Sequence, residues 1–303
     1  MGDRVLDLKP EELATIHPKD LLESIRLSEG RTLLVEIISH KTPLITEITN
    51  GELAAAFGAD ILLMNQYDVG RPLIAGIRDN MNFKPLDSQK KMAGRAIGIT
   101  LEPVDWNTPV FGKREILPPG RVASAANARR AHEQGAQIVV LTGNPKTGVT
   151  NKAIQNSITE IKNELGEDII VAAGKMHAAG SLEQGKSALA SMEDLELFIQ
   201  AGADIIIVPA PGTRQGATIE YVSEAADLAH KNNRLLMTAI GTSQESANLE
   251  TIRTIALYSK MAGADLHHLG DGAFGGMAPP ENILEYSIVI RGKRHTYKRM
   301  AMR

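Results

Sequence analysis

One short phrase recurs four times along the chain: Phe57-Gly58-Ala59-Asp60 precedes ILLMN, Gln134-Gly135-Ala136-Gln137 precedes IVVLT, Ala201-Gly202-Ala203-Asp204 precedes IIIVP, and Ala262-Gly263-Ala264-Asp265 precedes LHHLG. Each copy follows a stretch of helical character. Glycine commonly ends a helix because it adopts the left-handed conformation without strain. The run after each glycine is apolar on both faces, which is typical of a parallel strand covered by helices. The phrase therefore predicts a helix, a short link and a buried strand, four times over.

Counting every apolar run of this kind gives eight, at residues 33–38, 61–65, 96–101, 138–142, 169–173, 205–209, 235–240 and 266–269. Helical segments lie between them. Eight strands that alternate with helices form the pattern of a (β/α)₈ TIM barrel. We therefore predict an α/β fold with the barrel over residues 31–303 and a short N-terminal helical extension over residues 1–30. An open doubly wound sheet is the alternative, although no dinucleotide-binding glycine motif follows the first strand.

Start signals support several of these helices. Pro10 and Pro18 each fit the first position of a helix in the extension. Such helices would close the bottom of the barrel or dock on another subunit, so we expect a homo-oligomer. Asn151, Ser191 and Asn248 can each cap a later helix by accepting hydrogen bonds from its free N–H groups.

Composition excludes several classes of function. The 303 residues include no cysteine, which rules out disulfides, thiolate catalysis and iron–sulfur clusters. A net charge of -3 and an aromatic content of 4% argue against a nucleic-acid partner. Because no apolar run approaches 18 residues, we expect no membrane span. The first residues lack the apolar core of a secretory signal, and we expect a cytoplasmic protein.

Links between elements differ in length on the two faces of the predicted barrel. Links from helix to strand contain about three residues of Gly-Ala-Asp type, whereas the segments after the second, third and fifth strands are long. Long loops gathered on one face commonly carry function. Active sites of barrels lie at the face where strands lead into helices. We therefore predict the functional site there.

Glycine-rich turns follow the last two strands. The predicted phosphate-binding residues are Gly241, Thr242, Ser243, Gly270, Asp271, Gly272, Gly275 and Gly276. Glycines let backbone N–H groups approach a phosphate closely, and the hydroxyls add donors. In these turns the sequence resembles the phosphate-binding (β/α)₈ barrels, which implies a small phosphorylated ligand. Asp271 departs from that pattern because a carboxylate would repel phosphate. The GDG fragment also looks like haloacid-dehalogenase phosphatases, but their Asp-x-Asp-x-Thr loop is missing.

The fifth strand leads into GKMH at residues 174–177. Alternation of period two places Lys175 and His177 on one face with Val171 and Ala173, and we expect this face to point inward. Lys175 could bind an anionic substrate or form a Schiff base. His177 could transfer a proton. The alternative is that Lys175 merely extends to solvent.

Carboxylates and further polar residues at other strand ends complete the predicted site. Glu36 lies inside an apolar strand, where a carboxylate is rarely buried without a partner, and Glu102 follows the third strand. Either could act as a second base. A structural salt bridge between Glu36 and Lys175 is the alternative. The predicted substrate contacts outside the glycine-rich turns are Asn144, Lys146 and Arg214.

A metal site is a further hypothesis. Glu36, Asp68 and His177 could hold Mg²⁺ or Mn²⁺, because hard cations prefer oxygen ligands. Nothing in the spacing of these residues requires such an ion.

The segment TEITNGELAAAFGADILLMN at residues 46–65 resembles the first helix and second strand of the phosphoenolpyruvate mutase and isocitrate lyase barrels. That resemblance implies the barrel fold. The family would also place an acidic metal cluster at the third and fourth strands and a Lys-Cys-Gly-His loop. This chain has no cysteine and no acidic pair after its fourth strand, so the resemblance covers fold more than chemistry.

Together these features predict an enzyme of lyase (aldolase-like) or isomerase type acting on a phosphorylated sugar or carboxylate. A metal-dependent hydrolase at the same face and a non-catalytic, metabolite-sensing barrel are the alternatives. Fold alone does not separate them.

Overall fold

The computed structural model describes residues 2–77, 84–176, 189–272 and 275–302. Eight parallel strands form a closed barrel in chain order, and β8 pairs with β1. The strands are β1 (Thr32–Ile38), β2 (Ile61–Asn65), β3 (Ala96–Leu101), β4 (Ile138–Leu141), β5 (Ile170–Gly174), β6 (Ile205–Pro209), β7 (Leu235–Ile240) and β8 (Leu266–Leu269). Their bounds match the predicted runs to within one residue. The (β/α)₈ prediction is confirmed, and pairing of β8 with β1 excludes the open sheet.

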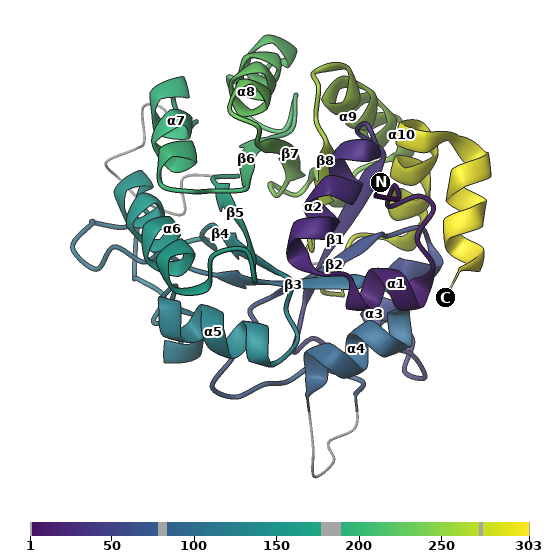
Figure 1. Ribbon diagram of the computed structural model, residues 1–303, viewed down its shortest axis with the longest axis horizontal. Coiled ribbons are helices and arrows are strands. Elements are labelled where there is room, and N and C mark those ends of the chain that lie inside the picture. The colour runs from purple at the N-terminus through teal and green to yellow at the C-terminus, as the bar shows by residue number, and fades with distance from the viewer. Residues whose placement is uncertain (1, 78–83, 177–188, 273–274, 303) are drawn as a thin grey trace.

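Helices surround the barrel (Figure 1). They are α3 (Asn50–Ala56), α4 (Pro85–Ala93), α5 (Ala125–Glu133), α6 (Asn151–Leu165), α7 (Met192–Gln200), α8 (Ile219–Lys231), α9 (Leu249–Met261) and α10 (Pro280–Ala301), with short 3-10 turns at Pro119–Arg121 and Gln244–Ser246. Within the described residues, none of the helices has the length and apolar character needed to cross a membrane.

The predicted caps of three helices are right in two cases. Ser191 accepts a hydrogen bond from the N–H of Asp194 at the start of α7, and Asn248 caps α9. The prediction for α6 is wrong. Thr150, which is extended, accepts from the N–H of Ala153, and Asn151 is already the first helical residue.

Each strand divides its side chains between two apolar layers. The inward layer includes Leu34, Leu63 and Val140. The outward layer includes Val35, Leu62 and their neighbours along the other strands, which pack against the helices. Because successive residues point to opposite faces, this division fixes which residue at each strand end faces the interior.

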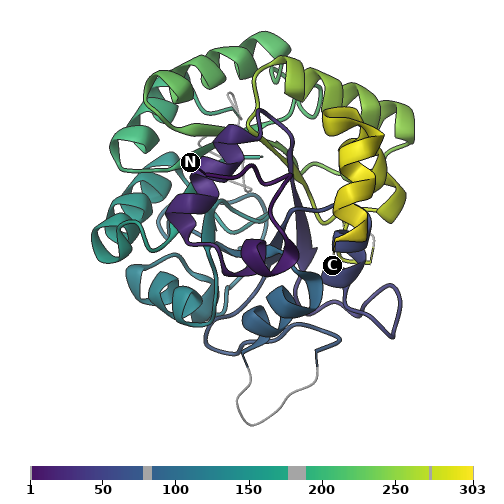
Figure 2. The same ribbon diagram turned by 45° about the vertical axis from the view of Figure 1, so that its right-hand side comes forward.

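The N-terminal helices α1 (Pro10–Thr15) and α2 (Pro18–Leu27) lie across one end of the barrel (Figure 2). Leu13, Leu21 and Ile25 are fully buried and belong to the same apolar cluster as the inward side chains. These helices therefore close the amino end of the barrel. Any cavity inside the barrel mouth must open at the carboxyl end.

A buried charge cluster attaches the last helix to the barrel. Asp60, in the link before β2, has no exposed surface, and Arg291 and Arg299 of α10 lie against it. Its Oδ2 is 2.5 Å from Nη1 of Arg291 and its Oδ1 is 2.9 Å from Nε of Arg299. The carboxylate also accepts a hydrogen bond from the N–H of Leu33 at 2.8 Å. One carboxylate thus compensates two buried guanidinium groups.

Candidate active site at the carboxyl end of the barrel

A cavity of about 230 Å³, here named the mouth cavity, lies at the carboxyl ends of the strands. It is lined by Glu36, Asn65, Thr100, Thr142, Gly143, Asn144, Pro145, Met176, Gly241, Ser243, Glu245, Asp271 and Gly272. Alternation explains this wall: Glu36, Asn65 and Thr142 each come two residues after an inward apolar side chain. A polar layer therefore lies directly above the apolar interior of the barrel.

Three carboxylates contribute to the wall of the mouth cavity. Glu36 and Glu245 are buried and Asp271 is half-buried. Oε2 of Glu36 lies 3.5 Å from Nε2 of His268, which has no exposed surface. Burial raises the pKa of Glu245, and the negative charges of Asp271 and Glu36 add to the rise while His268 opposes it. Glu245 therefore holds its proton more tightly than an ordinary glutamate.

Side-chain amides cross the floor between β2 and β4. Nδ2 of Asn65 donates to Oδ1 of Asn144 at 3.1 Å and to Oδ2 of Asp271 at 3.0 Å. Nδ2 of Asn144 donates back to Oδ1 of Asn65 at 3.2 Å. Glu102 supports this pair from behind, since its Oε2 accepts from the N–H of Asn144 at 2.9 Å and its Oε1 lies 2.5 Å from Nη2 of Arg121.

Several buried polar atoms around the mouth cavity lack a hydrogen-bond partner among the described residues. They are Oγ1 of Thr100, Oγ1 of Thr142, Oε2 of Glu245 and both ring nitrogens of His268. Buried polar groups are nearly always hydrogen-bonded in folded proteins, because leaving one unpaired costs free energy. Their concentration at one cavity indicates that a ligand or ordered water completes them.

Backbone strain marks the same end of the barrel. Gln66, Lys146 and Ser243 have φ of 57°, 67° and 82°, which is the left-handed region, and none is glycine. They lie just beyond β2, β4 and β7. Strained backbone of this kind persists where surrounding structure enforces it, and it concentrates at functional sites.

Lys175 does not point into the barrel, contrary to the expected inward face. Val171 and Ala173, which share its face, belong to the outward layer against the helices. Met176 lines the mouth cavity in its place. Nor does Lys175 pair with Glu36, whose ion-pair neighbour is His268. Within the described part of the chain, Asp194 and Arg214 influence the charge of Lys175.

Burial lowers the pKa of Lys175 to about 8, with Asp194 opposing the fall and Arg214 adding to it. At pH below 8 the lysine is protonated in both folded and unfolded chains, so the folded state carries the full cost of burying the charge. Between pH 8 and the ordinary value of 10.5 the folded state loses its proton first, which relieves that cost.

We therefore expect the wild type to gain up to roughly 3 kcal/mol of stability relative to Lys175→Met as pH rises from 7 to 11. Urea unfolding of both proteins across this range measures the difference. A difference that does not change with pH would contradict the lowered pKa.

The remaining predicted residues take several positions. Gly241, Ser243, Gly272, Asn144 and Asp271 line the mouth cavity, whereas Lys146 is exposed and Arg214 directs Nη1 toward the carbonyl of Met176 at 3.5 Å. The hydroxyl of Thr242 donates to the carbonyl of Thr213. Gly270 lies tightly against β7, and the carbonyls of Gly275 and Gly276 accept from Asn50 and Ile38 of the neighbouring unit. These last glycines fix the chain rather than face the cavity. His177 lies outside the described residues.

Of the residues proposed for a metal, the two that the structure describes, Glu36 and Asp68, are not brought together. Glu36 lines the mouth cavity, whereas Asp68 lines a separate cavity and accepts from the N–H of Gly70 at 2.8 Å. Over residues 2–77, 84–176, 189–272 and 275–302, no three His, Asp or Glu side chains are grouped as ligands of one ion.

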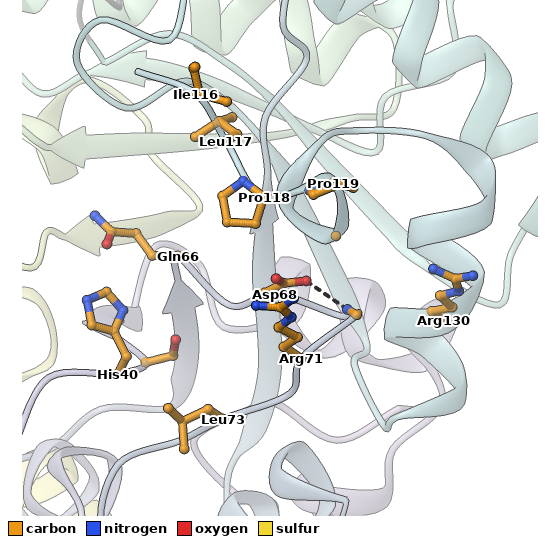
Figure 3. Close-up of a pocket in the computed structure, with 13 residues that line it drawn as sticks. His40, Gln66, Asp68, Arg71, Leu73, Ile116, Leu117, Pro118, Pro119 and Arg130 are labelled. Atoms are coloured by element: carbon orange, nitrogen blue, oxygen red, sulfur yellow. Dashed lines mark hydrogen bonds between the residues drawn. The ribbon is translucent and has the colours of Figure 1, made fainter. Parts of the chain in front are cut away.

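This separate cavity, the outer cavity, has a volume of about 720 Å³ and lies beside the loops after β1, β2 and β3. Figure 3 shows His40 and Gln66 on one side, Arg130 on the other, and Asp68 with Arg71 between them. Leu73, Ile116 and neighbouring prolines add an apolar edge. Its basic side chains distinguish it from the mouth cavity.

Comparison with known proteins places the chain in a family. The sequence pattern of the family described as "Domain of unknown function (DUF7916)" matches residues 6–303. The chain belongs to this family. No curated protein was found to match the sequence.

Solved structures similar to this DUF7916 member include an archaeal fructose 1,6-bisphosphate aldolase, with a TM-score of 0.55, 13% identity, and coverage of 89% of this chain and 98% of that chain. Another is 2,3-dimethylmalate lyase, a member of the PEP mutase/isocitrate lyase superfamily, with a TM-score of 0.51, 12% identity, and coverage of 86% and 83%. The likeness to TIM-barrel proteins is thus confirmed. At such low identity it establishes the fold alone.

Several side chains that lie around the mouth cavity of this DUF7916 member were not predicted from the sequence. Thr142 and His268 follow inward residues by two positions and Thr100 follows the inward Ala96 by four, so the phase of each strand could have revealed them. Glu245 gave no such signal, because it lies in a 3-10 turn after β7 rather than in a strand. Its burial depends on contacts that the chain pattern does not encode.

Proposed function

We propose that the protein is an enzyme of the lyase or isomerase type and that its substrate reacts in the mouth cavity. One observation carries this proposal: two buried carboxylates, Glu36 and Glu245, face a small cavity around which further buried polar atoms lack partners. Buried acidic groups with unequal surroundings are the usual means by which one site both removes and returns a proton.

The two glutamates suit different roles. Glu245, whose pKa burial raises, is the better proton donor. Glu36, with the imidazole of His268 at 3.5 Å, is the better acceptor. A lyase or isomerase of this kind would remove a proton from a carbon or hydroxyl of the substrate at Glu36 and deliver one from Glu245.

The asparagine pair would orient the substrate. Asn144 uses one N–H of its amide for Asn65, and its second N–H can donate to a hydroxyl or carbonyl oxygen in the cavity. Glu102 acts through Asn144, because it holds the backbone N–H of that residue. We therefore assign Glu102 a positioning role.

The phosphate that the glycine-rich turns predict fits the mouth cavity poorly. Glu36 and Asp271 would repel it, and among the described lining residues there is no lysine or arginine to compensate. The names of the two structural neighbours, an aldolase and a lyase, agree with the proposed reaction class as an analogy between folds.

A conversion assay tests the proposal. Lyases and isomerases need no second substrate, so the protein is incubated with pools of small hydroxylated, amino and carboxylated metabolites and followed by NMR. We expect one compound to decline as an isomer or two fragments appear, and heat-denatured protein to have no effect. Binding without conversion would instead indicate a sensing barrel. Uptake of water that a chelator abolishes would indicate a metal-dependent hydrolase.

A further inference from the structure

The mouth cavity has a marked imbalance of charge. Three carboxylates line it, and the described part of its wall contains no lysine or arginine. The basic groups nearby have other partners or directions: Arg121 lies against Glu102, and Arg214 is directed toward the carbonyl of Met176. Among the described residues, His268 lies 3.5 Å from Glu36. An anion entering this cavity would face like charges.

The unpaired hydrogen-bond acceptors of the mouth cavity also favour a cationic ligand. Glu245 lines the cavity, and its Oε2 is buried and has no partner among the described residues. A neighbouring ammonium group favours the ionised form of Glu245. In that form the carboxylate only accepts, so the partner that completes Oε2 is a donor. An ammonium group has three donors and no acceptor, which matches a wall of carboxylates.

Two threonine hydroxyls also belong to residues that line the mouth cavity. Oγ1 of Thr100 and Oγ1 of Thr142 are likewise buried and unpartnered within the described chain. A hydroxyl can donate and accept, so a hydroxyl or carbonyl oxygen of the ligand satisfies it. The volume of about 230 Å³ restricts the ligand to a small molecule.

We propose that the ligand of the mouth cavity is a small amine whose ammonium group lies against Glu245, Glu36 and Asp271 and whose neighbouring oxygen contacts Thr100 and Thr142. This inference deepens the proposed function, because it names the substrate class of the same site. The amine is bound as a cation by charge and hydrogen bonds, and no covalent step is involved.

Three probes of nearly equal size test the charge requirement: ethanolamine, ethylene glycol and glycolate, with inorganic phosphate as a fourth. Each is added at tens of millimolar to the full-length protein near pH 7 with ionic strength held constant, and the melting temperature is measured. A compound that binds only the folded state raises it. We expect ethanolamine to raise the melting temperature most, ethylene glycol less, and the two anions not at all.

Two variants test whether ethanolamine binds at Glu245. Glu245→Gln keeps the shape of the side chain but removes its charge, and we expect its affinity for ethanolamine to fall by about tenfold or more. Glu196→Gln on the exposed face of α7 is the matched control and should bind as the wild type does. Equal shifts for all probes, a larger shift with glycolate or phosphate, or equal ethanolamine binding by Glu245→Gln would overturn the proposal.

The experiments distinguish an error in the amine class from an error in the proposed lyase or isomerase function. Conversion of a neutral or anionic compound in the NMR assay would contradict the amine class while the lyase or isomerase proposal stands. Ethanolamine binding that depends on Glu245, with no conversion of any amine, would support the amine class and contradict the lyase or isomerase proposal.

Discussion

Glu36→Gln is expected to lower the turnover of the converted compound by about 10²–10⁴-fold, the range that loss of a general acid or base produces. The amide has nearly the same size as the carboxylate, but it cannot take up a proton. Because Glu36 contacts the cavity at the end of β1, the loss should fall on kcat. Steady-state rates and the melting temperature are measured together, so that loss of fold is separated from loss of chemistry.

Glu47→Gln is the matched control for this prediction. Glu47 lies in the loop after β1 at the same end of the barrel, and it is exposed. Its variant should retain the rate of the wild type. An unchanged kcat in Glu36→Gln would remove this residue from the chemistry and leave Glu245 as the acid or base to be tested.

Asp60→Asn should lower the free energy of unfolding by roughly 3–5 kcal/mol. The substitution leaves Arg291 and Arg299 buried without the carboxylate that compensates both, and an uncompensated buried charge is costly. The carboxylate bridge between α10 and the link before β2 is then lost. Urea denaturation, followed by circular dichroism, measures the change.

Asp7→Asn provides the comparison for Asp60. Asp7 also faces two cations, Arg4 and Lys298, but these pairs are partly exposed. Such pairs contribute about 0–1 kcal/mol each, so this variant should remain close to the wild type. Equal losses in the two variants would show that burial does not determine the strength of these pairs.

The strands could be predicted from sequence because each is a short apolar run of the kind a helix-covered barrel requires. Which alternate side chains of a strand point into the barrel could not always be predicted. In the run before Lys175 both faces are apolar, so nothing in IIVAAG reveals which alternate residues point inward. The structure sets that phase through pairing of β5 with β4 and β6, and it turns Met176 rather than Lys175 toward the cavity.

Other features depend on contacts between distant parts of the chain. Asp60 is the aspartate of one copy of the recurring Gly-Ala-Asp phrase, and in the sequence it looks like an ordinary link residue. Only the fold brings Arg291 and Arg299 against it. Glu245 likewise acquires its environment from Asp271, His268 and Glu36, which come from two other strands or their loops. Such partners are separated by too many residues for local patterns to indicate them.

A crystal structure of the protein grown with the compound that it converts would show whether the mouth cavity is the active site. We expect the compound to occupy the mouth cavity, with polar atoms within hydrogen-bond distance of Glu36 and Glu245. A compound bound in the outer cavity beside Arg71 and Arg130, with the mouth cavity empty, would contradict it.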